Sequence, residues 1–285
     1  METLKEILSP DFLLRNSVYT SVLVGFACPL VGVFLVLRRL VFMGVALALS
    51  LPLWLGLKMD ASSEQTEHLL AFAGSSAFTL AAILILAFME RRGRGLPEGR
   101  LGAAYVVSAA ASILLLSKNR FAEMGWLDLL KGEIITISNF DLALTGGALA
   151  FVLLVLGLFS KELLFVSFDR AMAATLGKNV LFWDALLYLL IGFTVSIAVL
   201  SVGPLIAFGF LLVPALTAHI FARNMKWFVI LASLIGGVTA FLGFWIAYAW
   251  DLPVGPTDVV LLGMVHALGF ATRKTVAFFI RPNAA

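Results

Sequence analysis

Long apolar runs separated by short polar segments dominate the chain. Nine such runs cover residues 18–37, 40–57, 69–89, 101–116, 140–159, 180–200, 205–222, 227–250 and 259–271. An α-helix needs about 20 mostly apolar residues to cross the hydrocarbon core of a bilayer. The pattern therefore predicts an all-α, polytopic membrane protein.

Only four residues, 201–204, separate the sixth run from the seventh, and Val-Gly-Pro at 202–204 makes the break. Proline cannot continue a preceding helix without losing a backbone hydrogen bond. The break is either a tight extracellular turn or a kinked re-entrant element. We therefore expect eight or nine membrane spans.

The polar segments between the runs are short. The longest, at residues 58–68, 90–100 and 117–139, are too short to form an independent hydrophobic core. We therefore expect one transmembrane domain over residues 1–285, with a surface segment at 1–17 and a cytoplasmic tail at 272–285. Leu and Trp alternate with charge in 117–139, which indicates an interfacial amphipathic helix or a re-entrant element on the outer side.

Basic residues are distributed unequally between the two sides of the predicted membrane. The side that holds Arg38 has 14 basic residues: Arg38, Arg39, Arg91, Arg92, Arg94, Arg100, Lys161, Arg170, Lys178, Arg223, Lys226, Arg273, Lys274 and Arg281. The opposite loops have 4: Lys58, Lys118, Arg120 and Lys131. Cytoplasmic loops carry the excess of Lys and Arg. The polar stretch at 161–184 is therefore predicted to lie in the cytoplasm.

That cytoplasmic stretch has the signals of a short helix of about two turns. Ser167 or Asp169 can cap its start, because a side-chain oxygen satisfies free backbone N–H groups there. Residues 171–176 are mostly strong helix formers. Gly177 follows where a left-handed residue often ends a helix. A capped helix outside the membrane suggests a contact with a partner.

Composition supports a membrane protein and excludes several other classes. Hydrophobic residues make up 61% of the chain and charged residues 13%, with a mean hydropathy of +1.04; soluble domains are about 25% charged. The net charge of +3 gives no indication of nucleic-acid binding. The single cysteine, Cys28, excludes an internal disulfide and is interpreted as a buried small hydrophobe.

The sequence lacks the motifs of an enzyme. It contains no GxxxxGK[ST] phosphate loop, no HExxH and no Cys/His cluster with the spacing of a zinc site. The predicted spans hold almost no paired ionisable groups, which membrane-embedded catalysis or proton coupling requires. We therefore expect no catalytic residues and no cofactor of its own, and an energy source supplied by a partner at the cytoplasmic helix.

A few polar residues in the last spans are candidates for a transport pathway. His219 is two residues beyond Thr217, but it also suits an interfacial position near Arg223. Asp258 could line the outer mouth of the pathway, or it could be a simple helix-start carboxylate. His266 lies eight residues after Asp258, about 12 Å along a helix, so the two need not meet.

Four segments, in the same order along the chain, resemble the ABC-3 family, the permease subunits of bacterial zinc and manganese ABC importers. They are residues 32–50 (GVFLVLRRLVFMGVALALS), 161–177 (KELLFVSFDRAMAATLG), 202–223 (VGPLIAFGFLLVPALTAHIFAR) and 248–263 (YAWDLPVGPTDVVLLG). The similarity extends over residues 18 to about 270. It implies a fold like that of the type II ABC importers and a location in the bacterial cytoplasmic membrane.

The resemblance also implies an assembly. This would be a homodimer of permeases with two ATPase subunits, which bind the ATP, and an extracytoplasmic solute-binding protein. The cytoplasmic stretch at 161–179 would be the coupling helix that sits in a groove of the ATPase. Its implied contact residues are Phe168, Asp169, Met172, Ala173, Leu176 and Gly177.

One departure from the family bears on the substrate. Members that move zinc or manganese carry G-D-A-[LI]-S-H-A early in the second span. This chain has Val45 at the aspartate position of that motif. At the histidine position it has Leu49, or Ser50 if the alignment slips by one residue. Neither valine nor leucine has the O, N or S donor that a divalent cation needs. Ser50 is therefore the pathway candidate in that segment, and the residues that ligate metal stay unknown.

These observations leave three alternative functions to test. The first is the permease of an ATP-driven importer for zinc, manganese or iron, or, given the missing ligands, for another small solute or metal chelate. The second is a stand-alone secondary carrier driven by an ion gradient. The third is a membrane scaffold or receptor subunit that has the fold without transport.

Overall fold

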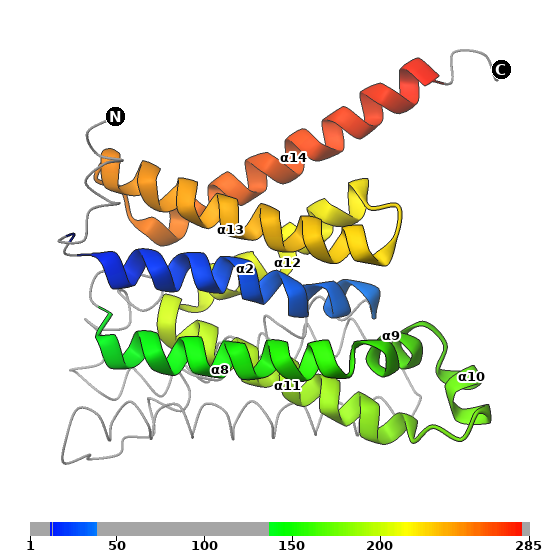
Figure 1. Ribbon diagram of the computed structural model, residues 1–285. Helices are drawn as coiled ribbons and strands as arrows, with labels where there is room; N and C mark the ends of the chain where they lie inside the picture. The colour runs from blue at the N-terminus through cyan, green and yellow to red at the C-terminus, as the bar shows by residue number, and fades with distance from the viewer. Residues whose placement is uncertain (1–11, 13, 39–136, 281–285) are drawn as a thin grey trace, which may run out of the picture.

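A computed structural model describes residues 12, 14–38 and 137–280, and every regular element among them is an α-helix (Figure 1). The helices are α2 (Arg15–Leu37), α8 (Asn139–Leu158), α9 (Ser160–Phe168), α10 (Arg170–Thr175), α11 (Val180–Val202), α12 (Pro204–Phe221), α13 (Met225–Ala249) and α14 (Val254–Ile280).

Six of these helices are long and apolar enough to cross a membrane: α2, α8, α11, α12, α13 and the part of α14 that ends at Thr275. They confirm the six spans predicted in this part of the chain and the all-α, polytopic class. α14 is longer than its predicted span, because it starts at Val254 and continues to Ile280. The predicted spans at 40–57, 69–89 and 101–116, and almost all of segment 117–139, lie outside the described residues.

Short polar side chains fix where several helices begin. Ser138, Asn179 and Asn224 precede α8, α11 and α13, and each accepts a hydrogen bond from the backbone N–H of the third residue of its helix, at 3.1, 3.2 and 2.9 Å. Such a cap satisfies one of the free N–H groups of the first turn. The caps place helix starts at the edges of the apolar runs.

The break between α11 and α12 is a one-residue turn at Gly203. This residue has φ +82° and ψ 162°, a conformation that glycine adopts without steric cost. Pro204 then occupies the first position of α12, where the missing N–H is not needed. Figure 1 shows α12 running back from this turn, so the structure favours the tight turn over the kinked element.

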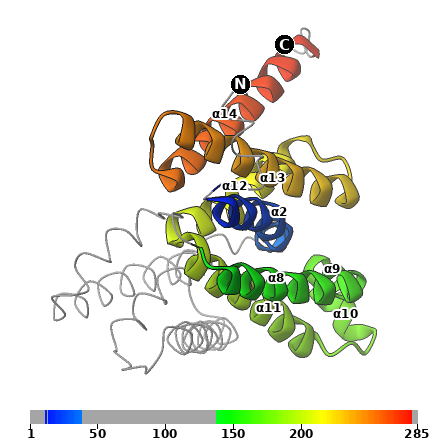
Figure 2. The same ribbon diagram turned by 60° about the vertical axis from the view of Figure 1, so that its left-hand side comes forward.

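α2 occupies the centre of the described bundle. Figure 2 shows α12 and α13 on one side of it and α8 and α11 on the other. A Cβ added at Gly32 would overlap the backbone oxygen of Leu211 in α12, and one added at Gly236 of α13 would overlap the backbone oxygen of Gly25 in α2. Small residues allow membrane helices to approach closely and pack by van der Waals contact. Both approaches therefore depend on glycine.

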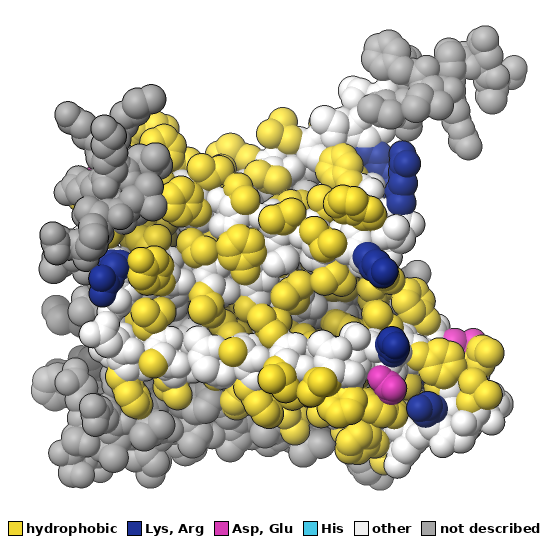
Figure 3. All heavy atoms as spheres, in the orientation of Figure 1, with side chains coloured by type: hydrophobic (Ala, Val, Ile, Leu, Met, Phe, Trp, Pro, Cys, Tyr) yellow, Lys and Arg dark blue, Asp and Glu magenta, His cyan; other side chains and the backbone are white. Residues whose placement is uncertain are grey.

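On the face drawn in Figure 3, the charged side chains of the described part lie at the two ends of the bundle, with a hydrophobic band between them. Arg15 lies at one end. The opposite end, where α9 and α10 lie (Figure 1), carries the remaining basic residues: Arg38, Lys161, Arg170, Lys178, Arg223, Lys226, Arg273 and Lys274. This end therefore has the positive charge that marks a cytoplasmic face.

Replacing Gly32 by alanine should destabilise the bundle. The added methyl group meets the Leu211 carbonyl, so α2 and α12 must separate, which costs about 1–3 kcal/mol or more. We expect the purified protein in detergent to melt several degrees lower. Gly147→Ala is the matched control, because an added Cβ at this exposed position of α8 has nothing within 4 Å. Equal losses for both variants would contradict the close approach.

Candidate functional site

Two short helices, not one, form the cytoplasmic connection between α8 and α11. α9 follows α8 after Phe159 and covers residues that the sequence assigned to a loop. It is held by Leu163 and Val166, which are both buried against the bundle. Sequence patterning missed this helix because its apolar residues are consecutive at 163–166 and show no helical period, although only Leu163 and Val166 are buried. α9 gives the next helix a fixed base.

α10 is the predicted capped helix. A side-chain oxygen of Asp169 accepts a hydrogen bond from the Met172 backbone N–H at 2.8 Å, so Asp169 caps the helix start. Gly177 has φ +73°, and the backbone N–H groups of Gly177 and Lys178 donate to the carbonyls of Ala174 and Ala173 at 3.1 and 3.0 Å. This pair of bonds is a Schellman motif. Both ends of the short helix are thus fixed by local interactions.

The apolar residues of this segment divide into an inward and an outward set. Ala173 is fully buried and packs α10 onto the protein. Phe168, Met172 and Leu176, spaced four residues apart, expose 65%, 53% and 62% of their surface. They lie at the positively charged end, where Figure 3 shows hydrophobic and basic side chains side by side. We call Phe168, Met172 and Leu176 the docking stripe.

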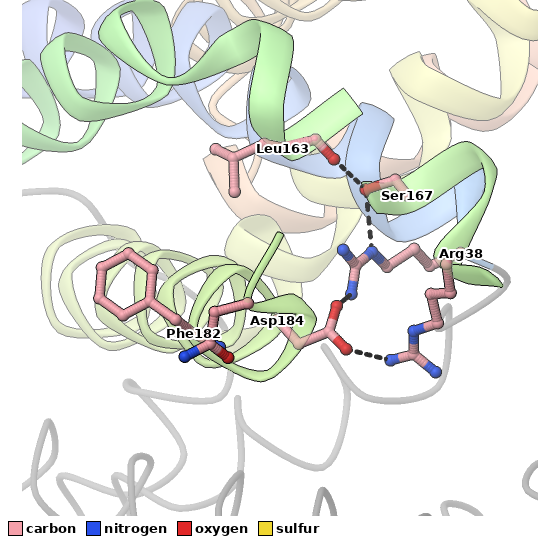
Figure 4. Close-up of polar contacts among 7 residues, drawn as sticks. Arg38, Leu163, Ser167, Phe182 and Asp184 are labelled. Atoms are coloured by element: carbon pink, nitrogen blue, oxygen red, sulfur yellow. Dashed lines mark hydrogen bonds and ion pairs between the residues drawn. The ribbon is translucent and has the colours of Figure 1, made fainter. Parts of the chain in front are cut away.

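Beneath α10 lies a charged cluster that the sequence did not predict. Asp184 of α11 accepts hydrogen bonds from Arg38 at 2.6 Å and from Arg170 at 2.7 Å, through different carboxylate oxygens. Arg38 also donates to the Ser167 hydroxyl at 3.0 Å (Figure 4). Its guanidinium lies 5.8 Å from the centre of the Tyr188 ring. Ser167 therefore binds Arg38 and the Leu163 carbonyl instead of capping α10.

The structure brings two of the predicted pathway residues together. The Thr217 hydroxyl of α12 lies 3.0 Å from Nδ1 of His266 in α14, and it also donates to the Val213 carbonyl. His219 does not join them, since it is exposed and its ring meets Phe228 edge-on at 5.5 Å. Ser50 lies outside the described residues. The Thr217–His266 pair is thus a polar contact within the apolar part of the bundle.

Asp258 is a second polar group within the bundle, and it is not a solvated helix-start carboxylate. Its side chain is fully buried, lies against the backbone of Gly243 in α13, and faces the hydroxyl of Ser21 in α2. Among the described residues, neither its oxygens nor the Ser21 hydroxyl has a hydrogen bond of acceptable geometry. Buried ionisable groups in membrane proteins often mark ion pathways. Asp258 is therefore a functional candidate, with Ser21 as a partner that the sequence did not indicate.

Asp258 and His266 stay apart, because they lie about two turns from one another on the same helix. Within residues 12, 14–38 and 137–280, no three His, Cys, Asp or Glu side chains gather into a group that could hold a metal ion. What these residues offer instead is two separate polar positions, Ser21–Asp258 and Thr217–His266. Either position supplies oxygen or nitrogen donors along the helix bundle.

Comparison with known proteins covers nearly the whole chain. A family model described as the ABC 3 transport family matches residues 11–273. The manganese import system permease protein ScaB of Streptococcus gordonii is 27% identical over 95% of this chain and 92% of its own. The manganese transport system membrane protein MntC of Listeria monocytogenes is 26% identical over 90% of this chain and 89% of its own. The solved structure of PsaBC from Streptococcus pneumoniae in complex with Fab superposes with a TM-score of 0.81 at 26% identity, over 94% of each chain.

Replacing Asp258 by asparagine should raise the stability of the bundle. The amide keeps the shape of the side chain but removes an ionisable group from a buried position that, among the described residues, offers it no oppositely charged side chain. We expect the melting temperature in detergent to rise by a few degrees. Asp251→Asn is the control, because Asp251 is exposed and asparagine tolerates its φ of 51°. A lower melting temperature for Asp258→Asn would show that the carboxylate makes a favourable interaction.

Proposed function

The chain belongs to the ABC 3 transport family, and from this premise we propose that it is the membrane-spanning permease subunit of an ATP-driven importer of a divalent transition metal. It is a multi-pass protein of the cytoplasmic membrane and a transport subunit, not an enzyme. The observation that carries the proposal is the family match over residues 11–273, which covers the described membrane helices and the α9–α10 segment together.

The α9–α10 segment is the proposed docking site for an ATPase subunit. Three large apolar side chains project from it at the charged end of the bundle. An amphipathic helix with such anchors suits an apolar groove of a partner. Asp169 and Gly177 act indirectly, because they fix the two ends of α10. Ala173 holds the helix to the permease.

The proposed assembly contains two permease chains, two ATPase subunits that bind ATP, and an extracytoplasmic solute-binding protein. Support for a second copy comes from large apolar side chains on the outer faces of α8, α13 and α14, which lipid or another helix can cover. They include Phe151, Leu154, Ile230, Leu234, Val238, Val260, Met264 and Leu268. Related proteins named as manganese permeases make manganese the first metal to test, and a relative named as a probable iron transport protein makes iron the second.

The replacement of metal ligands in the second span favours a second candidate substrate. Val45 and Leu49 offer no donor atoms, so a bare ion has fewer ligands there than the family pattern provides. A metal chelate or another small solute would not need them. For a bare metal, the pathway would use the oxygen and nitrogen donors of Asp258 and of the Thr217–His266 pair, together with Ser50.

Placing a charge on the docking stripe should prevent ATPase binding. We expect Met172→Glu and Leu176→Glu to reduce co-purification of the ATPase subunit at least about tenfold, because a buried apolar anchor at an interface is worth about 1–2 kcal/mol or more. The permease should keep its melting temperature, since both side chains are exposed. Lys226→Glu, in the first turn of α13, is a control on the same face of the membrane. Normal ATPase binding by both stripe variants would contradict the docking site.

The substrate is tested with the complete complex in liposomes. We expect a manganese-loaded solute-binding protein to stimulate ATP hydrolysis and metal uptake more than zinc- or iron-loaded protein. Stimulation by a metal chelate alone would establish the second candidate. Uptake that needs an ion gradient but no ATPase would make the chain a secondary carrier, and a stable complex without any substrate-stimulated hydrolysis would make it a scaffold.

A further inference from the structure

Asp184 joins three parts of the chain that are far apart in sequence. Its two carboxylate oxygens bind Arg38 at the end of α2 and Arg170 at the first position of α10, at 2.6 and 2.7 Å. Asp184 itself lies in the first turns of α11. Figure 4 shows Arg38, Ser167 and Asp184 converging on one point between these helices. We call Arg38, Asp184 and Arg170 the ion triad.

The two halves of the ion triad differ in exposure. The side chains of Arg38 and Asp184 are 6% and 13% exposed, whereas that of Arg170 is 49% exposed. The buried half is further held by the Ser167 hydroxyl and the Tyr188 ring. Separating a buried ion pair costs much free energy, because each charge would then be buried without an opposite charge beside it. An exposed pair contributes much less and forms and breaks readily.

The triad lies between the docking segment and the centre of the bundle. Arg170 directly follows the cap residue of α10, so it moves with that helix. Arg38 ends α2, which packs against α12 and α13 through Gly32 and Gly236. From Arg38 the chain continues into the apolar run 40–57, which carries Val45 and Leu49. A displacement of α10 therefore reaches α2 by a short chain of charged contacts.

We propose that Asp184 is a positioning residue that transmits movement of the ATPase-docking helix α10 to the central helix α2. The inference rests on the proposed function, since it presupposes an ATPase bound at the docking stripe. The buried Arg38–Asp184 pair keeps α2 and α11 together as one unit. The half-exposed Arg170–Asp184 pair sets where α10 sits on that unit. Asp184 thus affects how ATP hydrolysis drives uptake, and not whether the ATPase binds.

The test compares Asp184→Asn, Arg38→Gln and the double variant in the complete complex. In Asp184→Asn we expect ATPase affinity to stay within about threefold of wild type, because the docking stripe is intact. Uptake per ATP hydrolysed should fall on the order of tenfold, within the usual range of a coupling between sites. Melting temperature should also fall in each single variant, because one buried charge loses its partner.

The double variant separates coupling from stability. Arg38→Gln with Asp184→Asn removes both buried charges, so melting temperature should recover, but uptake per ATP should stay low because the link is absent. Recovery of uptake together with stability would show a purely structural triad and overturn the proposal. Lys226→Gln is the control for a charge change on the same face.

Failure of this inference is distinguishable from failure of the proposed function. If wild-type permease binds no ATPase and hydrolyses no ATP in its complex, the proposed function fails. If wild type docks and transports while all triad variants keep the wild-type ratio of uptake to ATP hydrolysed, only the role of Asp184 fails.

Discussion

The close approach of α2 to α12 and α13 is the constraint on which the rest of the described bundle depends. At Gly32 and Gly236 the backbones pack without intervening side chains. In a lipid environment the hydrophobic effect contributes little to the association of helices. Close van der Waals packing must therefore stabilise the bundle. With α2 fixed in this way, its end at Arg38 has a defined position, and the charged contacts under α10 can form there.

The docking segment combines rigidity with exposed apolar surface. Asp169 and the turn at Gly177 fix a helix of six residues, which would be unstable in isolation. Ala173 anchors it from below, while the docking stripe remains exposed. Apolar side chains exposed to water are unfavourable for an isolated protein and typical of an interaction surface. The exposed docking stripe on this fixed segment therefore suits the partner contact that we propose.

The polar groups within the bundle have a different character from those at its ends. Asp258 lies buried against Gly243, and Thr217 pairs with His266 between α12 and α14. Such groups are unfavourable in an apolar interior unless they are satisfied or used. Since Val45 stands where the family pattern has an aspartate, the transport pathway that we propose relies on oxygen and nitrogen donors elsewhere in the chain.

The sequence by itself determined the features that depend on local patterning. Runs of apolar residues gave the six spans of the described region, Asp169 and Gly177 gave the ends of α10, and the order of the motifs gave the family. These features are local because hydrophobic length, capping and left-handed glycine involve residues within a few positions of one another.

Only the tertiary structure decided which distant side chains meet. Arg38 and Asp184 are 146 positions apart, and Thr217 and His266 are 49 apart. No periodic pattern in the sequence predicts either pair, since each contact forms where two separate helices meet. Burial of Asp258 likewise follows from the packing of α12 and α13 against α14, and the helical state of α9 follows from the burial of Leu163 and Val166. Packing between helices, not the pattern along any one of them, set these contacts.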